Sequence, residues 1–248
     1  MTIRRLPTTS SPESTIIHRP GLVDKPKEQK TFKILVIGEV SVGKTSLIKR
    51  YVHNLFSNQY RATIGVDFAL KKIIWSDEID IIIQLWDIAG QDRFASLTRV
   101  YYKGASGSFV ITDASNPDSF ESAIKWKKDF DSKVTLENGQ PVPSLLLVNK
   151  CDLEKVGIAG DESKLDCFSK ENGFTSWCYV SAKDNIGIKE AAKLLIKKIM
   201  AIVESQENRE NGIQNVDDAQ EPGMDNVIIM TNGKADHLSP AKKSKCEC

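Results

Sequence analysis

The octapeptide GEVSVGKT, residues 38–45, decides the fold. It follows an apolar run, FKILVIG, and precedes a helical pattern over residues 44–55. It fits the pattern GxxxxGK[ST] of a phosphate-binding loop, whose backbone N–H groups, lysine and final hydroxyl bind phosphate oxygens and Mg²⁺. Val40 and Ser41 stand where many such loops carry small residues, often glycine. The motif predicts a phosphate binder rather than an ordinary strand–helix turn, and it raises the question of whether hydrolysis is retained.

Apolar runs alternate with helical patterns beyond this loop. Strands are expected at residues 32–38, 66–75, 79–88, 107–114, 144–151 and 177–182, and helices at 44–55, 92–103, 117–132, 161–172 and 187–204. Asn116 and Pro117 predict the N-cap and first residue of the third helix. The strands are nearly continuously apolar, which is typical of strands covered by helices on both faces. KKIIWSDEIDIIIQ, residues 71–84, predicts a hairpin that turns at 76–78. The fold class is therefore α/β, with a doubly wound six-stranded sheet that is mostly parallel and has one antiparallel strand.

Three segments divide the chain. Residues 1–30 are rich in Pro, Ser, Thr and charge without a sustained period, which predicts a disordered extension. Residues 31–204 carry the strand–helix alternation and form the expected domain. Residues 205–248 are polar and acidic with one apolar patch at 227–230, which predicts a disordered tail containing an interaction segment.

Composition excludes several classes of protein. The chain has 248 residues, 34 basic and 33 acidic, so its net charge of +1 gives no overall attraction to nucleic acid. It has neither a signal-peptide core nor an apolar run of about 18 residues for a membrane span, which predicts a protein that is cytosolic or faces the cytosol. The spacing of the five cysteines indicates neither a disulfide framework nor a zinc site.

Three further motifs predict the ligand. WDIAGQ places Asp87 at the end of the third strand, where a carboxylate can hold a metal through water, and places Gly90 and Gln91 at the γ-phosphate. NKCD follows the fifth strand, so that Asp152 can accept both donors of the N1/N2 edge of guanine, which adenine does not offer. SAK, residues 181–183, ends the sixth strand and can close on the same base. Readings as an ATP-binding protein or a nucleoside-monophosphate kinase leave NKCD and SAK without a role.

These motifs, in this order, resemble the Ras superfamily over residues 31–204. IGVDF (64–68), RFASLT (93–98) and YYKGA (101–105) are similar to the signatures of the Rab GTPases. YRATIGVDFALK, RVYYKGA and KENGFTSWCYVSAKDNIGIKEAA are similar to the branch of Rabs thirty-two and thirty-eight, which is associated with endosomes, phagosomes and lysosome-related organelles. The resemblance implies a P-loop small GTPase fold, bound GTP or GDP with Mg²⁺, and slow GTP hydrolysis that controls vesicle traffic.

The resemblance also implies residue roles. Gln91 is expected to orient the attacking water in catalysis, together with Lys44 and Thr63. Mg²⁺ is expected to be bound by Thr45, Thr63 and Asp87. Effectors are expected to read Phe68, Trp86 and Tyr101. The expected nucleotide-binding residues are Gly38, Glu39, Val40, Ser41, Val42, Gly43, Lys44, Thr45, Ser46, Phe56, Tyr60, Thr63, Asp87, Gly90, Asn149, Lys150, Asp152, Ser181, Ala182 and Lys183.

The C-terminal CEC fits the Rab pattern in which both thiols, here Cys246 and Cys248, carry geranylgeranyl groups. Two lipids give a stable anchor where one gives reversible binding, and Lys242, Lys243 and Lys245 add attraction to an anionic leaflet. A metal site or redox pair in this tail would need ligands that the tail does not supply. The implied partners of a monomer are an exchange factor, a GTPase-activating protein, a GDP-dissociation inhibitor, a prenylation escort protein and effectors.

The main alternative for function is a nucleotide-binding scaffold that hardly hydrolyses GTP. Val40 aligns with a glycine of Ras whose replacement by valine impairs hydrolysis, because the side chain crowds the glutamine and an incoming arginine. Rabs commonly tolerate larger residues there. We therefore expect slow turnover that depends on Gln91. A translation-type or signal-recognition GTPase would need further domains.

Overall fold

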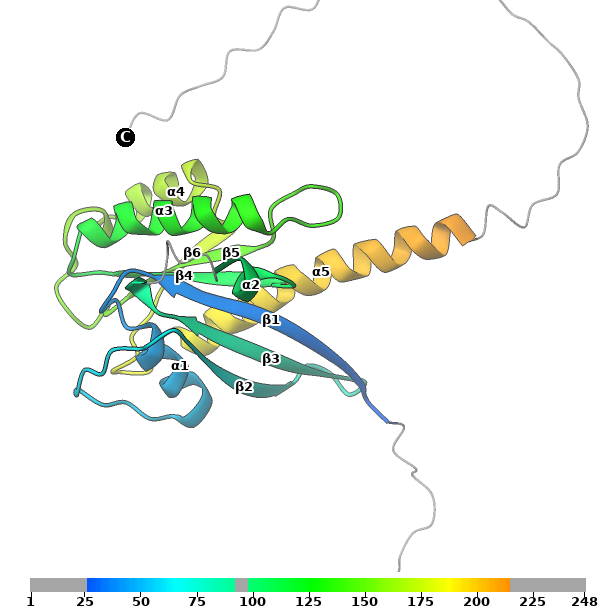
Figure 1. Cartoon of the computed structure of the whole chain (residues 1–248), viewed down its shortest axis with the longest axis horizontal. Coiled ribbons are helices and arrows are strands. Elements are labelled where there is room, and N and C mark those ends of the chain that lie inside the picture. Colours follow the sequence, from blue (N-terminus) through cyan, green and yellow to red (C-terminus); the bar gives the residue numbers. More distant parts are fainter. Residues whose placement is uncertain (1–25, 92–97, 215–248) are drawn as a thin grey trace, which may run out of the picture.

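One six-stranded sheet forms the centre of the computed structural model, which describes residues 26–91 and 98–214 (Figure 1). The strands are β1 (Glu28–Gly38), β2 (Val66–Ile74), β3 (Ile79–Ile88), β4 (Gly107–Asp113), β5 (Ser144–Asn149) and β6 (Ser176–Tyr179). Their order is β2-β3-β1-β4-β5-β6, with β2 antiparallel to β3 and the other neighbours parallel. The predicted strand number, mixed character and hairpin are confirmed.

Helices cover both faces of this sheet. They are α1 (Lys44–His53), α2 (Thr98–Tyr102), α3 (Asp118–Lys133), α4 (Glu162–Glu171) and α5 (Ile188–Gln214), with a 3₁₀ turn at Gly157–Gly160. Helices α1 and α5 lie on one face, and α3 and α4 on the other (Figure 1). None of the helices within the described ranges is long and apolar enough to cross a membrane.

Alternate residues of β1 face two separate cores, which explains the continuous apolar run. Ile34 and Val36 pack in the core that includes residues of α1 and α5, whereas Leu35 and Ile37 pack in the core of α3 and α4. All four side chains are fully buried. A strand buried on both faces is held firmly, and β1 ends at the phosphate-binding loop.

Helix α3 begins at Asp118, one residue after its predicted start. Pro117 already has helical dihedral angles, φ −58° and ψ −33°. The Asn116 side-chain oxygen accepts the backbone N–H of Asp118 at 3.1 Å, as expected of an N-cap asparagine.

Two elements extend beyond their predicted ends. Strand β1 begins at Glu28 because residues 28–31 continue the parallel pairing with β3, although their polar side chains give no strand pattern. Helix α5 continues from the predicted end at 204 to Gln214, and Glu207 on this extension forms an ion pair of 2.9 Å with Lys30 of β1. The predicted disorder is therefore wrong for residues 28–30 and 205–214.

The remaining tail predictions lie outside the described residues. These are the disorder of 1–25 and 215–248, the apolar patch at 227–230, Lys242, Lys243, Lys245, Cys246 and Cys248, and the first part, 92–97, of the predicted second helix.

Candidate functional site

The phosphate-binding loop connects β1 to α1 through two glycines that no other residue could replace without movement. At Gly38 (φ 145°) an added Cβ would lie 2.5 Å from the Ile111 carbonyl oxygen, and at Gly43 (φ 97°) it would lie 2.4 Å from Asn149 Nδ2. The N-terminus of α1 has neither a side-chain cap nor an acidic residue in its first turn. Its N–H groups and helix dipole therefore favour an anion.

Lys44 is buried inside this loop. Its Nζ donates to the carbonyl oxygens of Gly38 at 2.9 Å and Glu39 at 2.8 Å. Burial lowers the pKa of the ammonium to about 8, against the opposing effect of the Asp87 and Glu39 carboxylates. A buried cation whose hydrogen bonds end on neutral carbonyls is suited to receive a phosphate.

The structure shows how the backbone of the phosphate-binding loop accommodates Val40 and Ser41. Only Ser41 has a left-handed backbone, with φ 65°, so Val40 is unstrained and Ser41 occupies a conformation that glycine would adopt more readily. Gly90 packs directly on this part of the loop, because an added Cβ would lie 2.5 Å from the Val40 backbone N. The loop keeps its phosphate-facing shape, and the backbone of Val40 meets the segment that carries Gln91.

Three oxygen-bearing side chains meet beside Lys44. The Thr45 and Thr63 hydroxyls lie 2.7 Å apart, Thr45 donates to Asp87 Oδ2, and Thr63 lies 3.4 Å from the same oxygen. Burial raises the pKa of Asp87, which the Thr45 hydrogen bond and the Lys44 charge oppose.

This group of oxygens fits Mg²⁺. Asp87 is 2% exposed, and its Oδ1 has no hydrogen-bond partner. Hard oxygen donors are the ligands that Mg²⁺ takes, usually with water and phosphate oxygens completing its shell. Elsewhere in the described ranges, no group of three or more His, Cys, Asp or Glu side chains could hold a metal ion.

The base end of the site is assembled from the loops that follow β5 and β6. Asn149 Nδ2 donates to the Val42 carbonyl at 2.8 Å, and Asn149 Oδ1 accepts the Ala182 N–H at 3.3 Å. Asn149 therefore joins the phosphate loop to the 181–183 loop, in addition to the base-binding role expected from the sequence. Lys150 has a left-handed backbone, with φ 61°, and pairs with the buried Asp113 at 2.6 Å.

Asp152 is held as an ionised carboxylate. Its Oδ1 accepts the Ser181 hydroxyl at 2.6 Å, and its Oδ2 lies 3.6 Å from Lys183 Nζ. Burial alone would raise the pKa of Asp152, but the Ser181 hydrogen bond, a backbone hydrogen bond and Lys183 together lower it. The carboxylate is therefore available to accept N–H donors at neutral pH.

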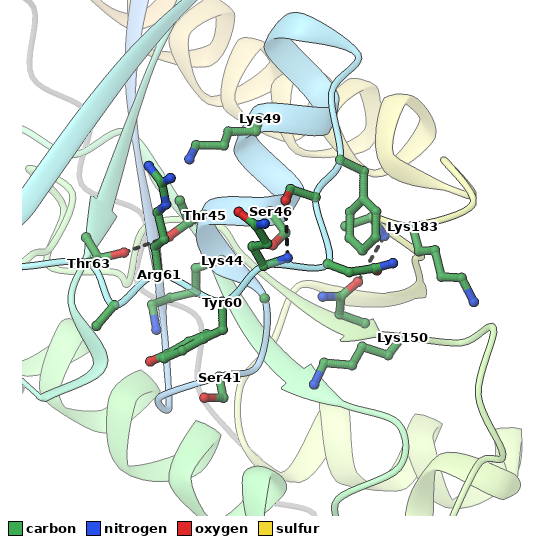
Figure 2. A pocket seen from close by; sticks show the side chains of 18 of the residues that line it. Ser41, Lys44, Thr45, Ser46, Lys49, Tyr60, Arg61, Thr63, Lys150 and Lys183 are labelled. Atoms are coloured by element: carbon green, nitrogen blue, oxygen red, sulfur yellow. Dashed lines mark hydrogen bonds between the residues drawn. The ribbon is translucent and has the colours of Figure 1, made fainter.

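These parts line one open cavity of about 860 Å³. Figure 2 shows Lys44, Thr45 and Thr63 toward one end of the view and Lys150 and Lys183 toward the other. The predicted residues that line the cavity are Val40, Ser41, Gly43, Lys44, Thr45, Ser46, Phe56, Tyr60, Thr63, Gly90, Gln91, Asn149, Lys150, Asp152, Ala182 and Lys183.

The other predicted nucleotide residues lie behind the wall and hold it. Gly38 and Glu39 accept from Lys44, Val42 accepts from Asn149, Asp87 lies behind Thr45, and Ser181 holds Asp152. Lys49, His53 and Arg61 also line the cavity, although the sequence assigned none of them to it.

The predicted effector residues lie outside the cavity. Phe68 and Trp86 are cross-strand partners on β2 and β3, with ring centroids 6.1 Å apart. Phe68 is 57% exposed, whereas Trp86 and Tyr101 are half-buried against the α3 and α4 core.

Replacing Asp152 with asparagine tests the base end. An amide can accept only one of the two guanine donors and offers an N–H to the carbonyl that xanthine carries in place of the amino group. Loss of one hydrogen bond, and of the charge that strengthens the other, predicts GDP binding weaker by about 100-fold, with xanthosine diphosphate bound more tightly than by the unmodified chain. Competition binding with both nucleotides measures this exchange. Unchanged GDP affinity in Asp152→Asn would contradict the assignment.

Comparison with known proteins agrees with this geometry. A family model described as "Ras family" matches residues 33–201. Human Ras-related protein Rab-32 is 56% identical over 185 residues, which cover 75% of this chain and 82% of that protein. Human Ras-related protein Rab-7L1 is 53% identical over 169 residues, 68% of this chain and 82% of that protein. Ras-related protein Rab-32A of Dictyostelium discoideum is 48% identical over 178 residues, with coverage of 71% and 81%.

The family match spans most of the chain, and all three relatives are Rab proteins that the chain covers over four-fifths of their length. Such proteins bind GTP or GDP with Mg²⁺, hydrolyse GTP, and work with regulators and effectors at membranes. The chain belongs to the Ras family and is a Rab-type small GTPase that regulates membrane traffic.

Proposed function

We propose that this GTPase is a slow switch for vesicle traffic at endosomes, phagosomes or lysosome-related organelles. It works on the cytoplasmic face of these membranes and cycles with the cytosol. The similarity to Rab-32 proteins and the branch motifs support this assignment.

The observation that carries the switch is the position of Thr63. This residue belongs to the loop between α1 and β2, yet its hydroxyl lies 2.7 Å from that of Thr45 at the start of α1. Thr63 and the Gly90 backbone are assigned to the γ-phosphate end, and Thr45, Thr63 and Asp87 to Mg²⁺. The metal supplies neutralisation of phosphate charge when bound.

Release of Thr63 after hydrolysis would loosen a segment whose side chains already face solvent. Ile64, directly beside it, is 93% exposed, and Tyr60 on the same loop is 65% exposed. Strand β2 then leads to the exposed Phe68, which with Trp86 and Tyr101 forms the proposed effector surface. The two nucleotide states therefore present different surfaces to effectors.

Hydrolysis is assigned to residues at the phosphate end. Lys44 supplies positive charge, Thr63 positions the γ-phosphate end, and Gln91 orients the attacking water. For the related Ras enzyme the intrinsic rate is on the order of 10⁻⁴ per second until a partner supplies an arginine. Val40 shares the cavity with Gln91, so its branched side chain restricts the positions that Gln91 and such an arginine can take.

The Val40→Gly variant should therefore hydrolyse GTP faster. Removing the isopropyl group is expected to raise the rate with an activating protein by about tenfold, which corresponds to about 1.4 kcal/mol of barrier. Single-turnover release of phosphate from preloaded GTP measures it. Val156→Gly, which removes the same side chain at an exposed position outside the cavity, is the matched control and should leave the rate near that of the unmodified chain.

Two results would oppose this assignment. A rate of GTP hydrolysis unchanged by Val40→Gly would show that the Val40 side chain does not hinder hydrolysis. If the unmodified chain released phosphate no faster than a Gln91→Leu variant, even with an activating protein, the result would instead support a long-lived GTP-binding scaffold. The similarity to Rab GTPases does not favour that scaffold.

The proposed partners follow the Rab cycle of a monomer. They are an exchange factor, a GTPase-activating protein, a GDP-dissociation inhibitor, a prenylation escort protein and effectors that read the surface around Phe68; no role with nucleic acid is proposed. Geranylgeranyl groups on Cys246 and Cys248 provide the membrane anchor.

Serine replacements in the tail test this anchor. A tagged chain with Cys246→Ser and Cys248→Ser together should become cytosolic, and either single change should give partial, reversible attachment, because one lipid binds only marginally. Changing Lys242, Lys243 and Lys245 to glutamine is the control and should leave most of the protein on membranes. A double cysteine variant that stays on membranes would refute the lipid anchor.

A further inference from the structure

Arg50, in the last turn of α1, joins this helix to two other segments. Its Nε donates to the Ala182 carbonyl and its Nη2 to the Lys183 carbonyl, both at 2.8 Å. Its Nη1 donates to the backbone and side-chain oxygens of Asn54 at 3.1 and 3.2 Å. Each nitrogen of the guanidinium group therefore has an acceptor, although Arg50 itself does not line the cavity.

The first two acceptors belong to the loop that closes the base end. Both backbone groups of Ala182 are held, because its N–H donates to Asn149 Oδ1 at 3.3 Å while its carbonyl accepts from Arg50. Ser181, the preceding residue, donates to the Asp152 carboxylate at 2.6 Å. The position of Asp152 therefore depends on a loop whose outer side is tied to Arg50.

The third contact fixes the start of the loop that carries Phe56. Asn54 ends α1 in a left-handed conformation, with φ 56°, and two residues later Phe56 lines the cavity. The guanidinium carbon of Arg50 lies 5.8 Å from the centre of the Phe56 ring, within the range of a cation–π contact. Arg50 thus orders both walls of the base end.

An arginine in the last turn of a helix often only complements the helix dipole, and the Asn54 contacts alone would fit that role. The bonds to Ala182 and Lys183 do not, because these carbonyls lie 132 and 133 residues along the chain. A planar guanidinium can meet both carbonyls at once, whereas a lysine ammonium cannot reproduce this geometry.

We propose that Arg50 is a positioning residue for guanine recognition and controls how long the nucleotide stays bound. It holds the 181–183 loop, and through Ser181 the Asp152 carboxylate, against the wall formed by Phe56. Its bonds reach the base end and leave the oxygens around Thr45 and Thr63 untouched. Loss of Arg50 therefore accelerates nucleotide release and leaves hydrolysis of bound GTP unchanged. This inference concerns the nucleotide site and stands apart from the organelle at which the protein works.

The test compares Arg50→Met with the unmodified full chain by displacement of fluorescent GDP in the presence of Mg²⁺. Methionine cannot donate a hydrogen bond, and loss of the guanidinium bonds that hold the base end indirectly predicts GDP release faster by about tenfold. Inosine diphosphate, which lacks the 2-amino group, provides a second readout. It should leave the unmodified protein faster than GDP does, and this difference in release rate should narrow in Arg50→Met because Asp152 is no longer held in place.

Lys71→Met is the matched control. Lys71 Nζ also donates to a carbonyl in the last turn of α1, that of Val52 at 3.3 Å, but it has no hydrogen bond to the 181–183 loop. The Lys71→Met variant should release GDP at the same rate as the unmodified chain. Arg50→Lys keeps the charge and the fold, and it should still release GDP faster; it takes the place of Arg50→Met if that variant does not fold.

Three results would overturn the proposal. The first is GDP release from the Arg50 variants at the unmodified rate. The second is acceleration of GDP and inosine diphosphate by the same factor, which would indicate general loosening. The third is altered single-turnover hydrolysis of bound GTP in Arg50→Met, which would place its effect at the phosphate end.

Discussion

The buried ammonium of Lys44 is the constraint on which the rest of the site depends. A cation with little exposure, held by the carbonyl oxygens of Gly38 and Glu39, is stable only if nearby groups offset the loss of water. Asp87 is the carboxylate with the largest such effect, but its Oδ2 already accepts from Thr45. A bound phosphate would supply the missing negative charge, and the folding of this loop would then be coupled to nucleotide binding.

The remaining structure holds this loop from several directions. Strand β1, buried on both faces, fixes its beginning, and the Asn149 side chain fixes its middle through the Val42 carbonyl. Gly90 packs against the backbone at Val40, which brings the end of β3 onto the loop. The residues assigned to phosphate, metal and base therefore share one frame, while Thr63 reaches it from a separate loop. Movement of Thr63 can therefore alter β2, which follows it in the chain, without disturbing the core.

The sequence was sufficient for the elements with strong periodicity and for the four motifs. The hairpin at 76–78, the Asn116 cap and the meeting of Lys44, Thr45 and Asp87 follow from local patterns and from the rule that strand ends gather at one edge of the sheet. The extensions of β1 and α5 were missed because their residues are polar. The β1 extension is ordered by pairing with β3, and the α5 extension contacts β1 through the ion pair between Lys30 and Glu207.

Long-range polar contacts could not be predicted from the sequence either. Nothing in the sequence around Arg50 points to carbonyls more than 130 residues away, and the motif NKCD does not reveal that Asn149 spans two loops. Ser41 could be recognised as unusual, but only the backbone shows that it, and not Val40, has the left-handed conformation. Motifs therefore predicted which residues gather at the site, and tertiary contacts decided how they are held.

Thermal unfolding of the full chain with and without Mg²⁺ and GDP tests the central role of Lys44 most directly. A ligand that binds only the folded state raises its stability with concentration. The account predicts a clear rise in Tm for the unmodified protein and for Lys49→Met, which changes a lysine of the same cavity one helical turn further on, and little or no rise for Lys44→Met. An equal rise in Lys44→Met would contradict the account.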